Sequence, residues 1–201
     1  MAEERLDQRF EKPIAFLVLV VFLGGGGIPI FSQIFGYPFS PSVEYYEASS
    51  PLRILFGLGA GAYIFYLTLA TDFFERRKNS GLDRSKHPLK WMLFLIFGPV
   101  LFGTTANMFV VFTIPMTLAV VAGGHIELTY EVRDPTASNS RYCQSKVTLK
   151  SMPWYGGDVC GVGESFRSRL RPGMKVALGG WGTAQGLFYN EISIVDETDD
   201  H

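Results

Sequence analysis

The sequence predicts an α+β membrane protein, in which three transmembrane helices precede a small Gly-rich antiparallel β domain that forms a partly open barrel or a sandwich. The apolar residues of the 201-residue chain gather in three blocks, at about residues 13–35, 54–74 and 91–124. Residues 125–196 instead alternate apolar and polar side chains, as half-buried strands do. We therefore expect a membrane domain over residues 1–124, a β domain over residues 125–196 and an acidic tail over residues 197–201.

The first two blocks are each long enough to cross the roughly 30 Å hydrocarbon core of a bilayer as a helix. A charged segment precedes the first block, so a signal peptide is an alternative, but acidic residues dilute this segment and no small-x-small cleavage site follows it. In the second block, Gly57 and Gly61 have the small-xxx-small spacing that favours close helix packing, although a Gly-rich segment also produces this spacing by chance. Asp72, beside basic residues at the end of this block, is expected at headgroup level and not in an intramembrane ion site.

The third block, residues 91–124, contains no charged side chain and has an awkward length. As one helix it would reach roughly 50 Å, which exceeds one crossing of about 30 Å and falls short of two. A turn at residues 103–107 would divide it into two short arms, giving a four-span protein with a cytoplasmic β domain. A tilted or kinked single crossing would instead place the β domain on the other side.

Loop charges indicate the orientation. Residues 75–90 carry six Lys or Arg, whereas residues 36–53 carry one. The positive-inside rule therefore places residues 75–90 and the N-terminus in the cytoplasm and residues 36–53 outside. The outer loop contains four aromatic residues, which we interpret as interfacial anchors: Tyr37, Phe39, Tyr45 and Tyr46.

The two cysteines favour three spans. Cys143 and Cys160 both fall in the predicted β domain, and an even pair in a small exported domain predicts a disulfide. The alternative is two unrelated buried thiols in a cytosolic domain. With the disulfide, the β domain lies outside the cytoplasm, and we expect the protein in a bacterial inner membrane.

Alternating apolar residues and turn signals divide the β domain into elements. Residues 164–170 are either a short helix or an extended connection, before the Arg-Pro-Gly turn at residues 171–173. The glycines around Trp181 lack a phosphate-loop pattern and are expected to serve tight β geometry. The predicted strands are His125–Asp134, Tyr142–Leu149, Met174–Leu178 and Phe188–Val195.

No catalytic, cofactor or metal site is predicted, and we expect a protein that is not an enzyme. His87, His125 and His201 lie in separate parts of the chain, and the cysteines have no Cys-x-x-Cys spacing. From residue 125 onward, eight Lys or Arg face ten Asp or Glu, so the basic surface that binds nucleic acid is missing.

The expected function is binding. Arg167, Arg169 and Arg171 would share one face of an extended segment, where they grip an acidic partner or anionic headgroups, or simply protect an edge strand. Trp154 and Trp181 form a second candidate surface, or supply core area. We expect the β domain to engage an envelope or exported protein, as an assembly, accessory or toxin-neutralising factor. The partners are the lipid bilayer and a protein or a second copy.

The alternative function is that of a channel or transporter subunit. In that case the Gly-rich spans and three polar residues of the third block line an oligomeric pathway: Thr104, Thr105 and Asn107. The spans contain no intramembrane charge pair that would support coupled transport.

Overall fold

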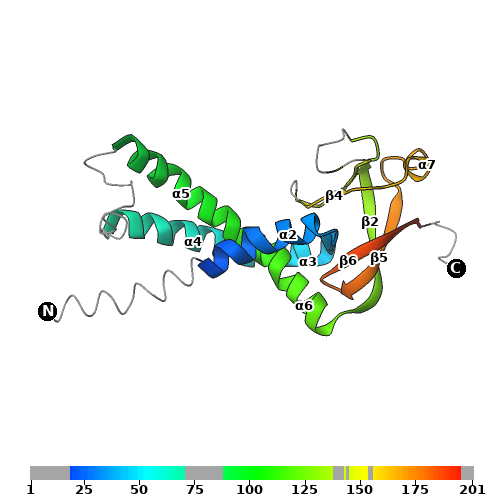
Figure 1. Cartoon of the computed structure of the whole chain (residues 1–201), viewed down its shortest axis with the longest axis horizontal. Helices are drawn as coiled ribbons and strands as arrows, with labels where there is room; N and C mark the ends of the chain where they lie inside the picture. Colours follow the sequence, from blue (N-terminus) through cyan, green and yellow to red (C-terminus); the bar gives the residue numbers. More distant parts are fainter. Residues whose placement is uncertain (1–18, 71–87, 138–142, 144, 154–155, 196–201) are drawn as a thin grey trace. The chain divides into compact units, whose positions relative to one another are not determined.

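The computed structural model describes residues 19–70, 88–137, 143, 145–153 and 156–195 (Figure 1). The chain divides into two compact units. A helical unit combines residues Met1–Ile30 with Ser49–Thr113, and a β unit combines Phe31–Ala48 with Ile114–His201. The boundary expected at residue 124 differs from this division, because residues 31–48 and 114–122 pack with the sheet.

Two helices of the described residues are long and apolar enough to cross a membrane, at Ser50–Leu69 and Pro88–Ala122. The first corresponds to α4 (Ser50–Ala70), and the second begins with α5 (Pro88–Met108). Of the first apolar block, residues 19–34 are helical, including a π-helical turn η1 (Leu23–Gly27) and α2 (Ile28–Ile34). The remainder of that block, residues 13–18, lies outside the described residues, as does Asp72. The membrane crossing of the first apolar block therefore stays a prediction.

Glycines allow α4 and α5 to pack closely. A Cβ atom added to Gly61 would lie 3.0 Å from the carbonyl oxygen of Pro99, and one added to Gly57 would lie 3.2 Å from that of Gly103. A Cβ atom on Gly103 would in turn lie 2.8 Å from the Gly57 carbonyl oxygen. Gly59 has no such neighbour within 4 Å. The small-xxx-small pair thus lies at a helix contact, where absence of side chains lets the two backbones approach.

The third apolar block is helical as far as Ala122. A π-helical turn η2 (Phe109–Thr113) follows α5, and α6 (Ile114–Ala122) follows η2. The alternative turn at residues 103–107 does not form, because these residues lie inside α5. The two π-helical turns contact each other: the Thr113 hydroxyl donates a hydrogen bond to the Gly24 carbonyl, and a Cβ on Gly24 would overlap the ring of Phe109.

The β unit contains a six-stranded antiparallel sheet in the order β1-β6-β5-β2-β3-β4, curled into a half-barrel (Figure 1). This confirms the coarser expectation of an α+β fold with a partly open antiparallel barrel. The predicted strands 125–134 and 188–195 correspond to β2 and β6. The predicted strand 142–149 is shorter in the structure, as β3, and the predicted strand 174–178 is longer, as β5. The elements are β1 (Phe39–Pro41), α3 (Val43–Ala48), β2 (Gly124–Asp134), β3 (Val147–Leu149), β4 (Asp158–Val159), α7 (Glu164–Arg167), β5 (Lys175–Thr183) and β6 (Gly186–Ile194).

The concave side of the half-barrel holds the core of the β unit. Alternate residues of β2 point into it, as the sequence periodicity predicts, and Tyr130 and Val132 are nearly inaccessible to solvent. Gly180 and Gly182 of β5 lie where a Cβ would overlap the backbone of β6. These glycines therefore permit the tight β5–β6 contact, which includes a register shift between Gly179 and Gly180. The other buried core residues are Val147, Leu149, Val159, Val162, Leu170, Val176, Leu178 and Leu187.

The interpretation of the first loop as interfacial anchors is wrong for Phe39. This residue is only 5% exposed and begins β1, which pairs with β6 at the edge of the sheet. The Tyr130 hydroxyl donates a 3.0 Å hydrogen bond to the Pro41 carbonyl, so β2 also holds this strand. A segment between the first two apolar blocks is therefore an integral part of the β unit.

Candidate functional site

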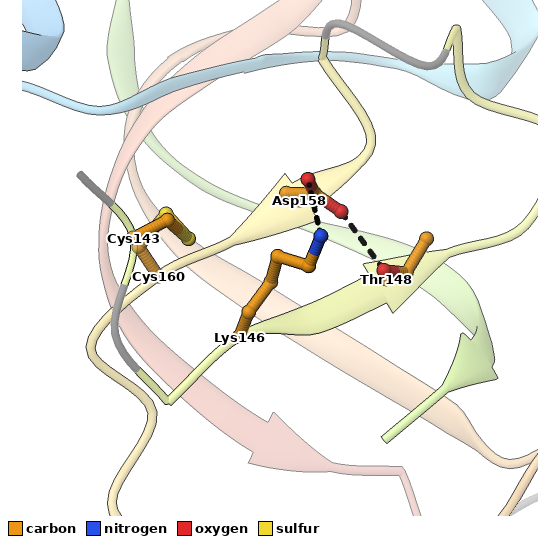
Figure 2. Close-up of polar contacts among 5 residues, drawn as sticks. All are labelled: Cys143, Lys146, Thr148, Asp158 and Cys160. Carbon is orange, nitrogen blue, oxygen red and sulfur yellow. Dashed lines mark hydrogen bonds and ion pairs between the residues drawn. A yellow bond between two sulfur atoms is a disulfide. The ribbon is translucent and has the colours of Figure 1, made fainter. Parts of the chain in front are cut away.

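A polar cluster lies where β3 and β4 meet (Figure 2). The strand register places Thr148 opposite Asp158, and the Thr148 hydroxyl donates a 2.8 Å hydrogen bond to Asp158 Oδ1. The ammonium group of Lys146 lies 3.1 Å from Asp158 Oδ2. Both carboxylate oxygens are thus engaged, one by a neutral donor and one by a cation.

The predicted disulfide between Cys143 and Cys160 is confirmed and lies beside this cluster (Figure 2). Cys160 directly follows β4, and Cys143 precedes β3 with a Cα–Cα distance of 5.1 Å between them. Next to the disulfide, the backbone N–H of Val162 donates to the carbonyl of Ser145. The covalent bond and this hydrogen bond close the β3–β4 hairpin at the end away from its turn.

Tyr189 connects this hairpin to β6. Burial raises the pKa of Tyr189 to about 12, while a hydrogen bond with the backbone of Cys160 acts in the opposite direction and the charge of Asp158 adds to the rise. The phenol therefore stays neutral at physiological pH. Because β6 and β4 are not neighbours in the sheet, this contact reaches across the concave side of the half-barrel.

The interactions in this cluster are structural. The Asp158 carboxylate and the Lys146 ammonium neutralise each other, and the two sulfur atoms are already joined. Within the described residues, no group of three or more His, Cys, Asp or Glu side chains is placed to hold a metal ion. The arrangement stabilises the hairpin and provides no paired nucleophile and base.

Of the two alternatives for residues 164–170, the short helix forms, as α7, so the arginines at 167, 169 and 171 do not share the face of an extended segment. Arg167 ends the helical turn α7, and Arg171 begins the Arg-Pro-Gly turn, because buried Leu170 holds the intervening segment against the core. The Arg169 guanidinium lies 5.3 Å from the centre of the Phe166 ring. None of these three arginines forms an ion pair within the part of the chain that the structure describes. They present a compact cationic segment.

Of the two tryptophans of the predicted surface, only Trp181 lies within the described residues. Trp181, on β5, is 53% exposed, and its indole N–H donates a 3.1 Å hydrogen bond to the Ala119 carbonyl near the end of α6. Trp154 lies outside the described residues, so the predicted joint surface stays a prediction. Sequence reasoning missed the neighbours of Trp181: the register places it opposite exposed His125 and half-buried Phe188, and buried Phe39 lies beyond Phe188. Only Trp181 itself gave a signal, since nothing in the pattern predicts that residues 39–41 join the sheet.

The polar residues proposed to line a pathway lie in α5. Thr104 and Thr105 donate their hydroxyl hydrogens to the carbonyls of Val100 and Leu101, at 2.8 and 2.9 Å. Such hydrogen bonds to the preceding turn are how threonine satisfies its hydroxyl inside a helix. These two hydroxyls are therefore engaged within their own helix.

Comparisons of the chain with protein-family models, with curated proteins and with solved structures found no match.

Proposed function

We propose that this chain is a non-enzymatic integral membrane protein that presents its disulfide-closed half-barrel outside the cytoplasm, where the barrel binds an envelope or exported protein. The observation that carries the proposal is the pairing of β1 with β6. In the sequence, β1 precedes the first of the two long apolar helices and β6 follows the second, yet the two strands belong to one sheet.

Strand pairing constrains the number of crossings. If α4 and the helix Pro88–Ala122 each cross the bilayer once, β1 and β6 emerge on the same side, as their hydrogen bonding requires. Two crossings by the second helix would leave them on opposite sides. The six basic residues at 75–90 favour the cytoplasm for the connection between the helices, so the sheet is on the outer side.

The disulfide supports the same side. Structural disulfides persist in oxidising compartments such as the bacterial periplasm and are rare in the cytosol. Cys143 and Cys160 are joined in the structure, and residues 143–160 include both strands of the β3–β4 hairpin. An extracytoplasmic half-barrel is consistent with this bond, whereas a cytosolic one would be exposed to reduction.

The cationic segment Arg167–Arg171 is our proposed contact for the partner. Arginine guanidinium groups bind carboxylates through two parallel hydrogen bonds, and Arg169 and Arg171 are exposed without an ion-pair partner among the described residues. The buried side chain of Leu170 fixes the backbone between them. The partner therefore presents an acidic segment to this turn.

The test examines both the side of the membrane on which the β unit lies and the residue that contacts the partner. A reporter that is active only outside the cytoplasm, fused after Val195, is expected to be active, and the same reporter fused after Ser80 is expected to be inactive. A photo-crosslinking residue in place of Arg169 should capture one partner in intact cells. The matched control replaces Asn190, which is exposed on β6. An inactive reporter after Val195, or equal capture at both positions, would contradict the proposal.

A further inference from the structure

The helix Pro88–Ala122 is longer than a bilayer crossing requires. Its 35 residues would extend about 52 Å at 1.5 Å per residue, against a hydrocarbon core of about 30 Å. The division of the chain into units locates the surplus: α5 and η2 belong to the helical unit, whereas the nine residues of α6 belong to the β unit. The surplus residues therefore pack on the sheet, against β5 and β6.

α6 has two apolar faces. Pro115, Met116 and Ala119 are buried, and the helix packs on β5 and β6. The opposite side leaves Val120 and Val121 70% and 79% exposed. The helix contains no charged residue, and Thr117 is the one polar side chain in it, so its exposed side is predominantly apolar.

Trp181 extends this exposed apolar surface onto the sheet. Its N–H is already satisfied by the Ala119 carbonyl, so the ring can leave water without losing a hydrogen bond. Gly123 keeps the contact open, because a Cβ there would lie 2.7 Å from Trp181 Nε1. The end of α6 and the indole ring thus form one surface.

The polarity changes along the sheet beyond this surface. Two residues before Trp181 on β5 lies Gly179, and the register places Glu127 and Glu191 on either side of it. Both carboxylates are exposed, and two residues along a strand span about 7 Å. Exposed valines, then an aromatic ring, then carboxylates follow one another, as in a chain that leaves a bilayer through its interface.

We propose that α6 is an interfacial helix, whose buried face packs on the sheet and whose exposed face, with Trp181, enters the headgroup boundary of the bilayer. This rests on the membrane location proposed above. The occupant is lipid because α6 is the end of the same helix, Pro88–Ala122, that is long and apolar enough to cross a membrane, and because residues 109–122 contain no charged side chain. Residues 88–113 then provide about 39 Å for the crossing, which a tilted helix accommodates.

The test uses the fluorescence of single tryptophans in the full chain. Replacing Trp91 and Trp154 by phenylalanine leaves Trp181 as the only tryptophan. In lipid vesicles, its emission is expected to be blue-shifted and to lose intensity when the acyl chains carry bromine near the headgroup. In the matched control, Trp181→Phe and Lys175→Trp move the tryptophan along the same face of β5, beyond the carboxylates. That tryptophan should be quenched by aqueous iodide and not by brominated lipid.

A third variant, with Trp91 as the only tryptophan, separates the two proposals. Loss of Trp91 emission in brominated lipid without loss of Trp181 emission would overturn the interfacial helix and leave the membrane location standing. No loss for either residue would overturn the membrane location as well. Shielding of Trp181 from iodide without quenching by lipid would indicate a protein contact and would also overturn the proposal. Each variant is compared only if Cys143 and Cys160 resist thiol labelling, which reports a folded β unit.

Discussion

Tyr130 shows how one buried hydroxyl holds together parts of the chain that are distant in sequence. It donates to the Pro41 carbonyl across 89 positions, linking β2 to the segment that precedes α4. Replacing Tyr130 by phenylalanine should lower the free energy of unfolding by about 1–3 kcal/mol, because the buried carbonyl loses its partner. Denaturant unfolding in detergent measures this, with the exposed Tyr37→Phe as the control. An equal effect in both variants would contradict the role of this hydrogen bond.

Tyr189 makes stability depend on pH in the alkaline range. Its pKa is about 12 in the folded protein against 10 for the free side chain, so the folded state holds the proton more tightly. Between these values the unfolded state binds fewer protons, and the free energy of unfolding falls as the pH rises from about 10 to 12. Below pH 10 the contribution is fully present. Unfolding at pH 9 and pH 11.5 should show a smaller decline in Tyr189→Phe; an identical decline would disprove the contribution.

At the scale of elements, the contact between α4 and α5 depends on where glycine stands. Gly61→Val should lower the free energy of unfolding by about 1–3 kcal/mol, since its side chain meets the Pro99 carbonyl at the helix contact. Gly59→Val, in the same helix, has open space and should have little effect. Thermal unfolding of both variants in the same detergent makes the comparison. Equal destabilisation would mean that helix propensity, not packing, is responsible.

The β3–β4 hairpin depends on its disulfide. By the loop-entropy relation, a bond with a sequence separation of 17 stabilises the folded state by about 3 kcal/mol. Reductant should therefore lower the melting temperature of the native protein. The Cys143→Ser/Cys160→Ser variant should melt at the lower temperature with or without reductant. A native protein insensitive to reductant under conditions that free both thiols would contradict this stabilisation.

Several elements could be predicted because their signal is local. β2 alternates over its whole length, since one face packs on the core and the other faces solvent. The arginine segment could not be predicted, because alternation in sequence does not reveal that Leu170 is buried and that a helical turn precedes it. β4 has only two residues and is defined by its partner, not by its own pattern.

For the whole molecule, the proposed topology predicts which positions share a side of the membrane. Single cysteines replacing Glu47 in α3 and Lys175 in β5 should both react with a membrane-impermeant thiol reagent in intact cells. A cysteine replacing Ser80 should react only after the membrane is permeabilised. The native cysteines do not interfere while they form the disulfide. Opposite labelling of positions 47 and 175 would be incompatible with one sheet that contains β1 and β6.

The sequence by itself determined the three apolar blocks, the alternating strands and the pair of cysteines, because hydrophobic periodicity and residue type are local properties. It left open whether residues 91–124 turn back at residues 103–107. Tertiary structure decided that these residues are helical and that β1 completes the sheet. Such pairing depends on hydrogen bonds between backbones distant in sequence, and Phe39–Pro41 is too short to carry a signal of its own. Helix α6 likewise has a buried face because it packs on β5 and β6, which the sequence of the helix does not reveal.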